Sequence, residues 1–156
     1  MKTLVLGLGN PILTDDGVGV RVAETVKSLL PTDSPVEVSE ASVGGLGLME
    51  RLVGYERVIL IDALNGDSKR PGSFHRLTLE DLQVISPTQH SVSAHDTNLN
   101  TALNIAGQMG LSLPTEVVIF GVEVENIVDF GEEPTSAVGR AVPLVADAVL
   151  AELNCP

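Results

Sequence analysis

Lys2–Leu8 (KTLVLGL) and Arg57–Ala63 (RVILIDA) are the two stretches of sequence that decide the fold. Both are short, almost continuously apolar and rich in Val, Leu and Ile, a pattern typical of strands that are covered on both faces. Strands with one solvent-exposed face alternate apolar and polar residues instead. The two stretches therefore predict buried strands in a mostly parallel sheet.

The rest of the chain alternates between strand-like and helix-like patterns. The pattern predicts a helix from Val18 to Leu30 that Pro31 stops, a short strand at Val36–Val38, and a glycine turn at Gly44–Gly47 followed by a short helix up to Val53. It then predicts a half-exposed edge strand at Ser73–Leu79, a long loop at residues 80–97, and a helix that begins near Thr97 or Asn98. The last two predicted elements are a buried strand at Glu116–Val122 and a C-terminal helix from Val138 to Val149, in which Pro143 marks either a kink or a later start.

This order predicts an α/β fold. We expect a three-layer α/β/α sandwich of the phosphorylase/hydrolase-like type, built around a mostly parallel sheet of about five strands with one antiparallel edge strand. No repeat or linker interrupts the pattern, so residues 1–156 are expected to form one domain.

Composition predicts a cytoplasmic protein with a packed core. Hydrophobic residues make up 44% of the chain and the mean hydropathy is +0.27, which argues against disorder. No stretch approaches the roughly 18 consecutive apolar residues of a membrane span, and the first apolar run is too short for a signal peptide. Cys155 is the only cysteine, so an internal disulfide is impossible.

The net charge of −12 excludes one class of partner. Nucleic-acid binders need positive surface to meet phosphates, and this chain has the opposite sign. The acidic residues gather in the last third of the chain, where Arg140 is the only basic residue after Leu111. This excess of negative charge fits either simple solubility or attraction for a basic protein partner.

Five polar side chains are expected at one edge of the sheet, because sites in open α/β sheets form beyond the carboxyl ends of the strands. Asp15 and Asp16 follow the first strand, Asp62 ends the central strand, Glu123 follows the last strand, and His95 lies in the long loop before a helix. If the strands are parallel, all five approach the same edge.

The acids also have structural interpretations. Asp15 precedes a helix and is well placed to cap its N-terminus, and the helix dipole favours an acid such as Asp16 in the first turn. Asp62 is harder to explain in this way. A carboxylate after Val-Ile-Leu-Ile loses hydration unless it meets a partner or a cation.

An imidazole completes the candidate set. His95 is the preferred histidine, His90 in the same loop is an alternative, and His75 on the edge strand is expected to be a surface residue. Imidazole suits nickel, zinc or iron, and a set of two carboxylates and one imidazole leaves positions for an outside ligand. Asp16, Asp62 and His95 therefore predict an open metal site.

Other catalytic motifs are missing from the sequence. The glycine-rich stretch at Gly7–Ile12 begins like a dinucleotide-binding loop, but Ile12 occupies the third glycine position. The sequence holds no Walker A motif, no Gly-x-Ser-x-Gly elbow and no His-Glu-x-x-His helix. Cys155 lies in a tail that is expected to fray, so a cysteine nucleophile is not expected.

Taken together, the short motifs resemble those of the [NiFe]-hydrogenase maturation endopeptidases. The motifs are GLGNPILTDDGVG at Gly7–Gly19, GGLG at Gly44–Gly47, VILIDA at Val58–Ala63, SAHD at Ser93–Asp96 and VVIFGVE at Val117–Glu123. With familiar spacing between them, the resemblance extends from residue 2 to about residue 150.

The resemblance implies a substrate and a role for each site residue. Such proteases bind the large-subunit precursor of a [NiFe] hydrogenase after nickel insertion and remove a short C-terminal peptide beyond its metal-binding cysteine motif. Asp16, Asp62 and His95 match the family's metal-contacting positions. Nickel would arrive on the substrate, so no tightly bound cofactor is expected. The expected partner is the precursor, and the protein is expected to be a monomer that binds neither nucleic acid nor membrane.

Two routes to hydrolysis remain open at this stage. Either the metal, or an aspartyl-type pair of Asp16 and Asp62 sharing a proton, activates water or polarises the scissile carbonyl.

Three rival functions also remain. A metal-sensing chaperone would hold the precursor without cutting it. A peptidyl-tRNA hydrolase-like esterase shares the Gly-Leu-Gly-Asn-Pro loop, but its next stretch carries a histidine where this chain has Asp15-Asp16-Gly17. A nucleotide-binding module would have to bind a dinucleotide or ATP, which a thermal-shift screen can test.

Overall fold

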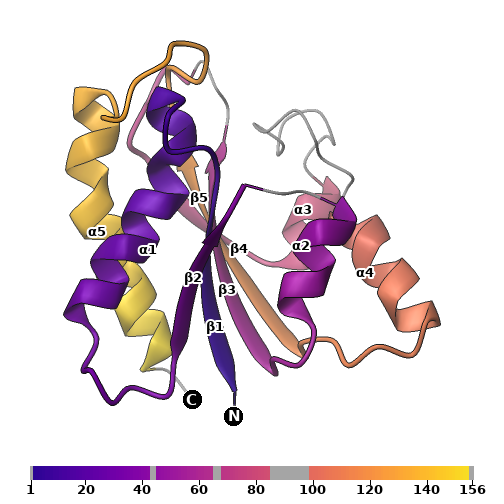
Figure 1. The fold of residues 1–156 in the computed structure, drawn as a ribbon. Coiled ribbons are helices and arrows are strands. Elements are labelled where there is room, and N and C mark those ends of the chain that lie inside the picture. Colours follow the sequence, from indigo (N-terminus) through magenta and orange to yellow (C-terminus); the bar gives the residue numbers. More distant parts are fainter. Residues whose placement is uncertain (1, 43–44, 65–67, 85–98, 155–156) are drawn as a thin grey trace.

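The computed structural model describes residues 2–42, 45–64, 68–84 and 99–154 of the chain. Five strands form one sheet in the order β2-β1-β3-β5-β4 (Figure 1). All neighbouring strands are parallel except β4, which runs antiparallel to β5 at the sheet edge. The strands are β1 (Thr3–Leu8), β2 (Glu37–Ala41), β3 (Arg57–Leu64), β4 (Phe74–Leu77) and β5 (Glu116–Glu123). The predicted five-stranded, mostly parallel sheet with one antiparallel edge strand is confirmed.

Helices cover both faces of the sheet, which confirms the three-layer sandwich (Figure 1). Two helices, α1 (Val18–Leu29) and α5 (Ser136–Leu153), pack on one face and against each other. The other face carries α2 (Gly45–Leu52), α3 (Leu79–Val84) and α4 (Leu99–Gln108). A short 3-10 helix, η1 (Thr14–Gly17), leads directly into α1.

Two apolar cores explain why the central strands read as unbroken apolar runs. Alternate residues of β3 turn to opposite faces, so Ile59 and Ile61 join the core beneath α1 and α5, while Val58 and Leu60 join the core beneath α2. All six residues of β1 are buried. Burying a Val, Leu or Ile side chain stabilises the fold by roughly 1.5–3 kcal/mol, so these strands supply much of the driving force for folding.

One predicted loop is partly wrong. The stretch at residues 80–97 was expected to be a loop, but it begins with helix α3, and the remainder of that stretch lies outside the described residues. Thr78 and Asp81 cap α3 reciprocally: the Asp81 carboxylate accepts the Thr78 N–H at 2.8 Å, and the Thr78 hydroxyl accepts the Asp81 N–H at 3.3 Å. This reciprocal cap resembles a capping box and explains why so short a helix forms.

The predictions made from the glycines at Gly44–Gly47 and from Pro143 were also partly wrong. The expected turn at Gly44–Gly47 is helical from Gly45 onward, and Gly44 lies outside the described residues. Helix α5 already begins at Ser136 and runs past Pro143, so the later start considered from the sequence is wrong. A proline inside a helix removes one backbone hydrogen bond. The close packing of α5 on α1 and β5 compensates for that loss.

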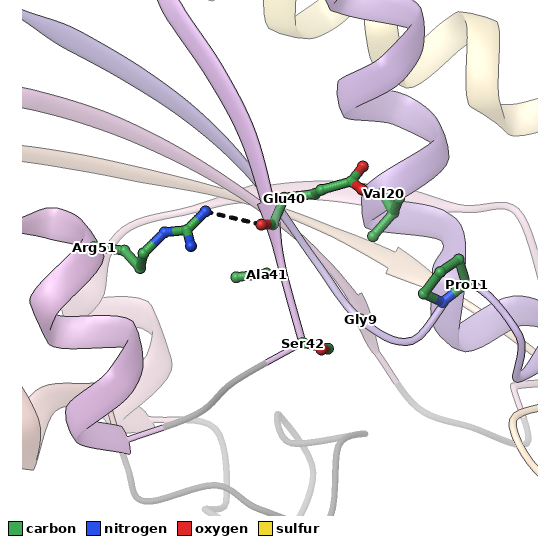
Figure 2. Close-up of a pocket in the computed structure, with 7 residues that line it drawn as sticks. All are labelled: Gly9, Pro11, Val20, Glu40, Ala41, Ser42 and Arg51. Atoms are coloured by element: carbon green, nitrogen blue, oxygen red, sulfur yellow. Dashed lines mark hydrogen bonds between the residues drawn. The ribbon is translucent and has the colours of Figure 1, made fainter.

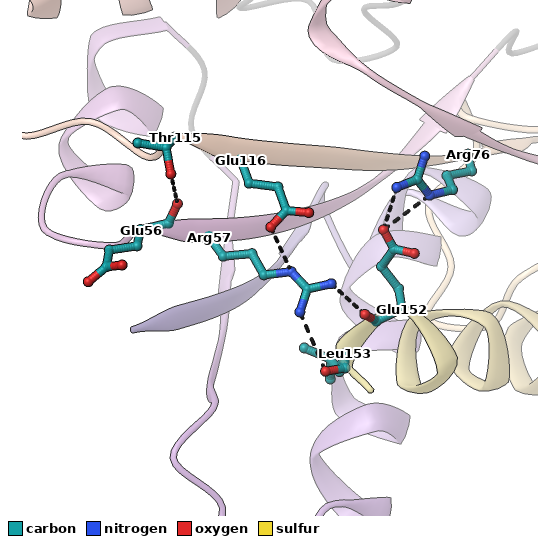
Figure 3. A network of polar contacts seen from close by, with 7 residues as sticks. All are labelled: Glu56, Arg57, Arg76, Thr115, Glu116, Glu152 and Leu153. Carbon is teal, nitrogen blue, oxygen red and sulfur yellow. Dashed lines mark hydrogen bonds and ion pairs between the residues drawn. The ribbon is translucent and has the colours of Figure 1, made fainter. Parts of the chain in front are cut away.

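A buried arginine joins the amino edge of the sheet to the end of α5 (Figure 3). Arg57, only 6% exposed, opens β3 and forms an ion pair with Glu116 at 3.3 Å. Its guanidinium also donates to the main-chain oxygens of Glu152 and Leu153, the latter at 3.4 Å. A cation at these carbonyls complements the helix dipole, so Arg57 stabilises the C-terminus of α5.

No helix in the described part of the chain is both long and apolar enough to cross a lipid bilayer.

Candidate functional site

The loop that leaves β1 turns back sharply and brings Asp16 to the carboxyl edge of the sheet. Gly9 adopts a φ of +131°, a conformation that side chains rarely permit, and a Cβ there would lie 1.9 Å from the main-chain oxygen of Asp16. The Asp16 carboxylate in turn accepts the main-chain N–H of Asn10 at 2.9 Å. Asp16 is 4% exposed, so its orientation is fixed by the loop that it closes.

Glycines also bring the start of α1 against the central strand. A Cβ on Gly19 would lie 2.2 Å from the main-chain oxygen of Ile61 and 2.4 Å from that of Leu8. Only glycine allows this backbone contact. Because Ile61 directly precedes Asp62, the contact sets the position of the η1–α1 segment, which carries Asp16, relative to the strand end that carries Asp62.

Asp62 lies near the carboxyl end of β3, in register with Gly121 of β5. It is the one residue of β3 that is not classed as buried. Its Oδ1 accepts the N–H of the next residue, Ala63, at 2.8 Å. Alternation along the strand turns the Asp62 side chain toward the face that carries α2. As predicted, Asp16 and Asp62 therefore both belong to the carboxyl edge of the sheet.

Asp15 does not cap α1, so that prediction is wrong. The N-cap residue of α1 is Gly17, and no side chain caps the helix. Asp15 is fully buried, and its carboxylate accepts the main-chain N–H groups of Glu125 at 3.1 Å, Asn126 at 3.0 Å and Thr135 at 2.7 Å. The Thr135 hydroxyl donates to it as well, at 2.8 Å. Asp15 thus anchors η1 to the loop after β5 and to the start of α5.

Glu123 belongs to a separate polar cluster. Its carboxylate lies 2.8 Å from His75 Nε2 on the neighbouring strand β4 and accepts the Ser68 hydroxyl, also at 2.8 Å. Burial raises the pKa of Glu123, but the hydrogen bonds from His75 and Ser68 outweigh it and leave the pKa below its ordinary value. His75 was expected to be only a surface residue, and this contact was missed because it joins positions 48 residues apart.

The third member of the predicted metal site is not part of this description. His95 and its alternative His90 lie outside the described residues. Among the residues that the structure does describe, no group of three or more His, Cys, Asp or Glu side chains is arranged to hold a metal ion. The three-residue site thus stays a prediction, of which the structure describes the two carboxylates.

A hollow of about 370 Å³ opens beside the loop that Asp16 closes (Figure 2). Gly9 and Pro11 of that loop line it, together with the end of β2, Val20 of α1 and Arg51 of α2. The Arg51 guanidinium reaches over to the main-chain oxygen of Glu40 at 2.9 Å. Space for a ligand is therefore available next to the carboxyl edge.

Comparison with known proteins agrees with this architecture. The model of the hydrogenase maturation protease family matches residues 20–152. The chain is 28% identical over 127 residues to the hydrogenase 2 maturation protease of Escherichia coli, a match that covers 81% of this chain and 76% of that protein. It is also 27% identical over 154 residues to the hydrogenase expression/formation protein HupD of Rhizobium leguminosarum bv. viciae, covering 98% of this chain and 74% of that one.

The fold is similar as well. The solved structure of the hydrogenase maturating endopeptidase HybD from Escherichia coli superposes with a TM-score of 0.80 at 27% identity, over 98% of this chain and 92% of that chain. These matches favour neither a peptidyl-tRNA hydrolase-like esterase, nor a nucleotide-binding module, nor a chaperone without hydrolytic activity. With a family match over most of its length and the family's fold, this chain belongs to the hydrogenase maturation proteases and is a hydrolase that acts as an endopeptidase.

Proposed function

We propose that this endopeptidase recognises the nickel-loaded large-subunit precursor of a [NiFe] hydrogenase and cleaves off its C-terminal extension. The observation that carries the proposal is the pair of carboxylates at the carboxyl edge, Asp16 and Asp62, in a chain of this protease family. Catalytic groups in open α/β sheets gather at this edge.

Nickel is part of the substrate in this proposal, and the protease supplies side chains that recognise it by coordination. Asp16, Asp62 and His95 are proposed to contact the metal as the precursor docks. Carboxylate and imidazole together form a suitable donor set for a divalent transition metal. A precursor without metal leaves the negative charges at the edge uncompensated, which disfavours its docking. The metal requirement would thus ensure that cleavage follows nickel insertion.

Two routes to hydrolysis fit these residues. In one, the substrate's metal polarises the scissile carbonyl or activates water. In the other, Asp16 and Asp62 share a proton as an aspartyl-type pair, and the ionised member takes a proton from water. A metal-free precursor that is cleaved with a raised KM but a normal kcat would favour the carboxylate pair, because that route needs the metal for docking and not for the reaction itself.

The first prediction tests the site directly. Nickel-loaded precursor is incubated with the wild-type protein and with the variants Asp16→Asn, Asp62→Asn and His95→Ala. Each substitution removes a charge or a ligand from the reacting centre, so we expect each to lower the rate of tail removal by about 100-fold or more. The shortening of the precursor is followed by gel electrophoresis and its mass by mass spectrometry.

Glu50→Gln is the matched control, because Glu50 is an exposed acid on α2. It should cleave at the wild-type rate. Full activity in all three site variants would refute the proposed site. A wild-type protein that binds the precursor without shortening it would refute the proposed reaction.

The proposal extends to the setting of the reaction. We propose that the protein acts as a monomer in the cytoplasm, with the hydrogenase precursor as its partner. The single cysteine is consistent with a reducing compartment, and the charge of −12 disfavours binding to nucleic acid.

A further inference from the structure

The outer edge of β2 presents main-chain groups that no strand of the described sheet takes up. β2 is the first strand in the sheet order, with β1 on its inner side. The Ala41 carbonyl faces β1, where it accepts the Gly9 N–H at 3.1 Å. Successive residues of a strand turn their main-chain groups to opposite sides. The main-chain groups of Val38 and Glu40 therefore point outward.

Only part of this edge is covered. Arg51 donates to the outward carbonyl of Glu40 at 2.9 Å (Figure 2). Within the described residues β1 is the one strand that pairs with β2, so no strand takes up the outward N–H groups of Val38 and Glu40 or the carbonyl of Val38. Free groups of this kind on an edge strand are a template for pairing with another extended segment.

Three hollows follow one another along this edge, between β2 and α1. Their volumes are about 370, 310 and 320 Å³. The first and second share Glu40 in their walls, and the second and third share Lys27 and Val38. They therefore lie end to end along the strand, and we call this row of hollows, from Gly9 to Pro31, the β2 groove.

The spacing of the hollows fits an added strand. Val36, Val38 and Glu40 lie two residues apart, and each lines one or two of the hollows. Alternate side chains of an extended segment also repeat every two residues, or about 6.6 Å. A segment paired with β2 would thus present every second side chain to the hollows, whose walls include the apolar residues Val20 and Ala23.

The β2 groove ends at the candidate site. Gly9 and Pro11 line its upper hollow, and Asn10 between them donates its N–H to Asp16. We propose that the C-terminal tail of the protease's substrate adds to the outer edge of β2 as an extra antiparallel strand. This inference rests on the proposed function. A tail that begins at the cut beside Asp16 and runs down the groove travels opposite to β2, which ends at the carboxyl edge.

Charge distinguishes this occupant from a second copy of the chain. Glu24 and Glu40 line the groove, and the whole protein carries a charge of −12, so two copies meeting at this edge repel each other. At the lower end the groove is lined by Lys27, which can meet the terminal carboxylate of a tail that ends there. The five residues of β2 span about 17 Å, which a tail of five or more residues can match.

The test compares Val38→Pro with Val38→Thr. Proline removes the outward N–H of Val38, whereas threonine keeps both this N–H and the branched shape of the side chain. We expect Val38→Pro to raise KM for the nickel-loaded precursor by about tenfold and to leave kcat within about twofold, since it removes a binding contact remote from the reacting bond. Val38→Thr keeps the outward N–H and should therefore raise KM far less than Val38→Pro.

A second measurement decides the matter if Val38→Pro does not fold. Amide hydrogen exchange of the wild-type protein is recorded by NMR with and without a synthetic peptide that has the sequence of the removed tail. The Val38 and Glu40 amides should exchange at least tenfold more slowly with the peptide, while those of Ser39 and Ala41, which already face β1, stay unchanged.

The outcomes separate this inference from the proposed function. A wild-type protein that leaves the precursor intact refutes the proposed function. Normal cleavage by the wild type, together with equal KM values for Val38→Pro and Val38→Thr or with unchanged exchange at Val38 and Glu40, overturns the β2 docking alone.

Discussion

Asp15 and Asp16 are neighbours with different partners. Asp16 closes the loop after β1, whereas the buried carboxylate of Asp15 accepts three main-chain N–H groups and one hydroxyl from the region between β5 and α5. Hydrogen bonds to a charged acceptor are stronger than neutral ones, and buried donors that lose their acceptor are costly. The structure thus assigns Asp15 to the support of the edge on which Asp16 lies.

Asp15→Asn is predicted to lower the free energy of unfolding by about 3 kcal/mol, because the amide nitrogen cannot accept the N–H groups that the lost oxygen bound. Urea denaturation followed by circular dichroism measures the change. Asp33→Asn, at an exposed position in the loop before β2, should change it by less than about 0.5 kcal/mol. An equal effect of the two substitutions would contradict the anchoring role of Asp15.

At the scale of the elements, the contact between α1 and the centre of the sheet depends on Gly19. Gly19→Ala places a Cβ against main-chain oxygens of β1 and β3, which cannot move aside as a flexible side chain can. We expect it to lower the free energy of unfolding by about 3 kcal/mol and to reduce cleavage of the precursor, because α1 must shift and carries η1 with it.

Gly107→Ala is the matched control for this helix substitution. The nearest atom to a Cβ on Gly107 of α4 is a Leu113 methyl carbon at 4.0 Å, so an added methyl group meets no obstacle. Alanine is favoured over glycine in a helix by about 0.5–1 kcal/mol, so this variant should be slightly more stable than the wild type. Thermal unfolding of both variants gives the comparison, and a stabilised Gly19→Ala protein would contradict the close contact.

The strands and helices were largely predictable from the sequence, because a strand that is buried on both faces must consist almost entirely of apolar residues. The runs at β1, β3 and β5 show it clearly, and Pro31 correctly marks the end of α1. Helix α3 was missed although Thr78 and Asp81 carry a capping signal, since its six residues are too few to show a period. The carboxyl edge could be inferred from topology, which brought Asp16 and Asp62 to the same side.

The partners of Asp15 could not be inferred in this way. Its acceptor role depends on N–H groups 110 to 120 residues further along the chain. Local sequence suggested an N-cap, because Asp before a helix is most often a cap. Long-range hydrogen bonds to main-chain atoms leave no trace in residue type, which is why this role becomes visible only in the folded chain.

At the scale of the whole molecule, stability should depend on pH through the pairing of α5 with the sheet. The hydrogen bond from Arg76 lowers the pKa of Glu152, an effect that exceeds the opposing effect of burial, and the charges of Arg76 and Arg57 lower it further (Figure 3). A carboxyl group with a lowered pKa in the folded state stabilises that state above its ordinary pKa. The contribution is lost as pH falls through the lowered value.

Glu152→Gln should therefore reduce the free energy of unfolding by about 1 kcal/mol at pH 6 and by much less at pH 3, where the wild-type carboxyl is also neutral. Chemical denaturation at both pH values measures the difference. The exposed Glu133→Gln substitution should show no such change with pH. A Glu152→Gln effect that is the same at pH 3 and pH 6 would rule out the ionic contribution.

The hydrogen bonds of Asp15 also have a consequence for biosynthesis. The ribosome releases residue 15 long before residues 125, 126 and 135, which supply the donors. A nascent chain can form β1 and α1 early, but its η1 turn lacks an anchor until residues 125, 126 and 135 have emerged. Newly made protease therefore acquires its anchored edge only after Thr135 has been synthesised, so chains that stop before this residue should be inactive toward hydrogenase precursors.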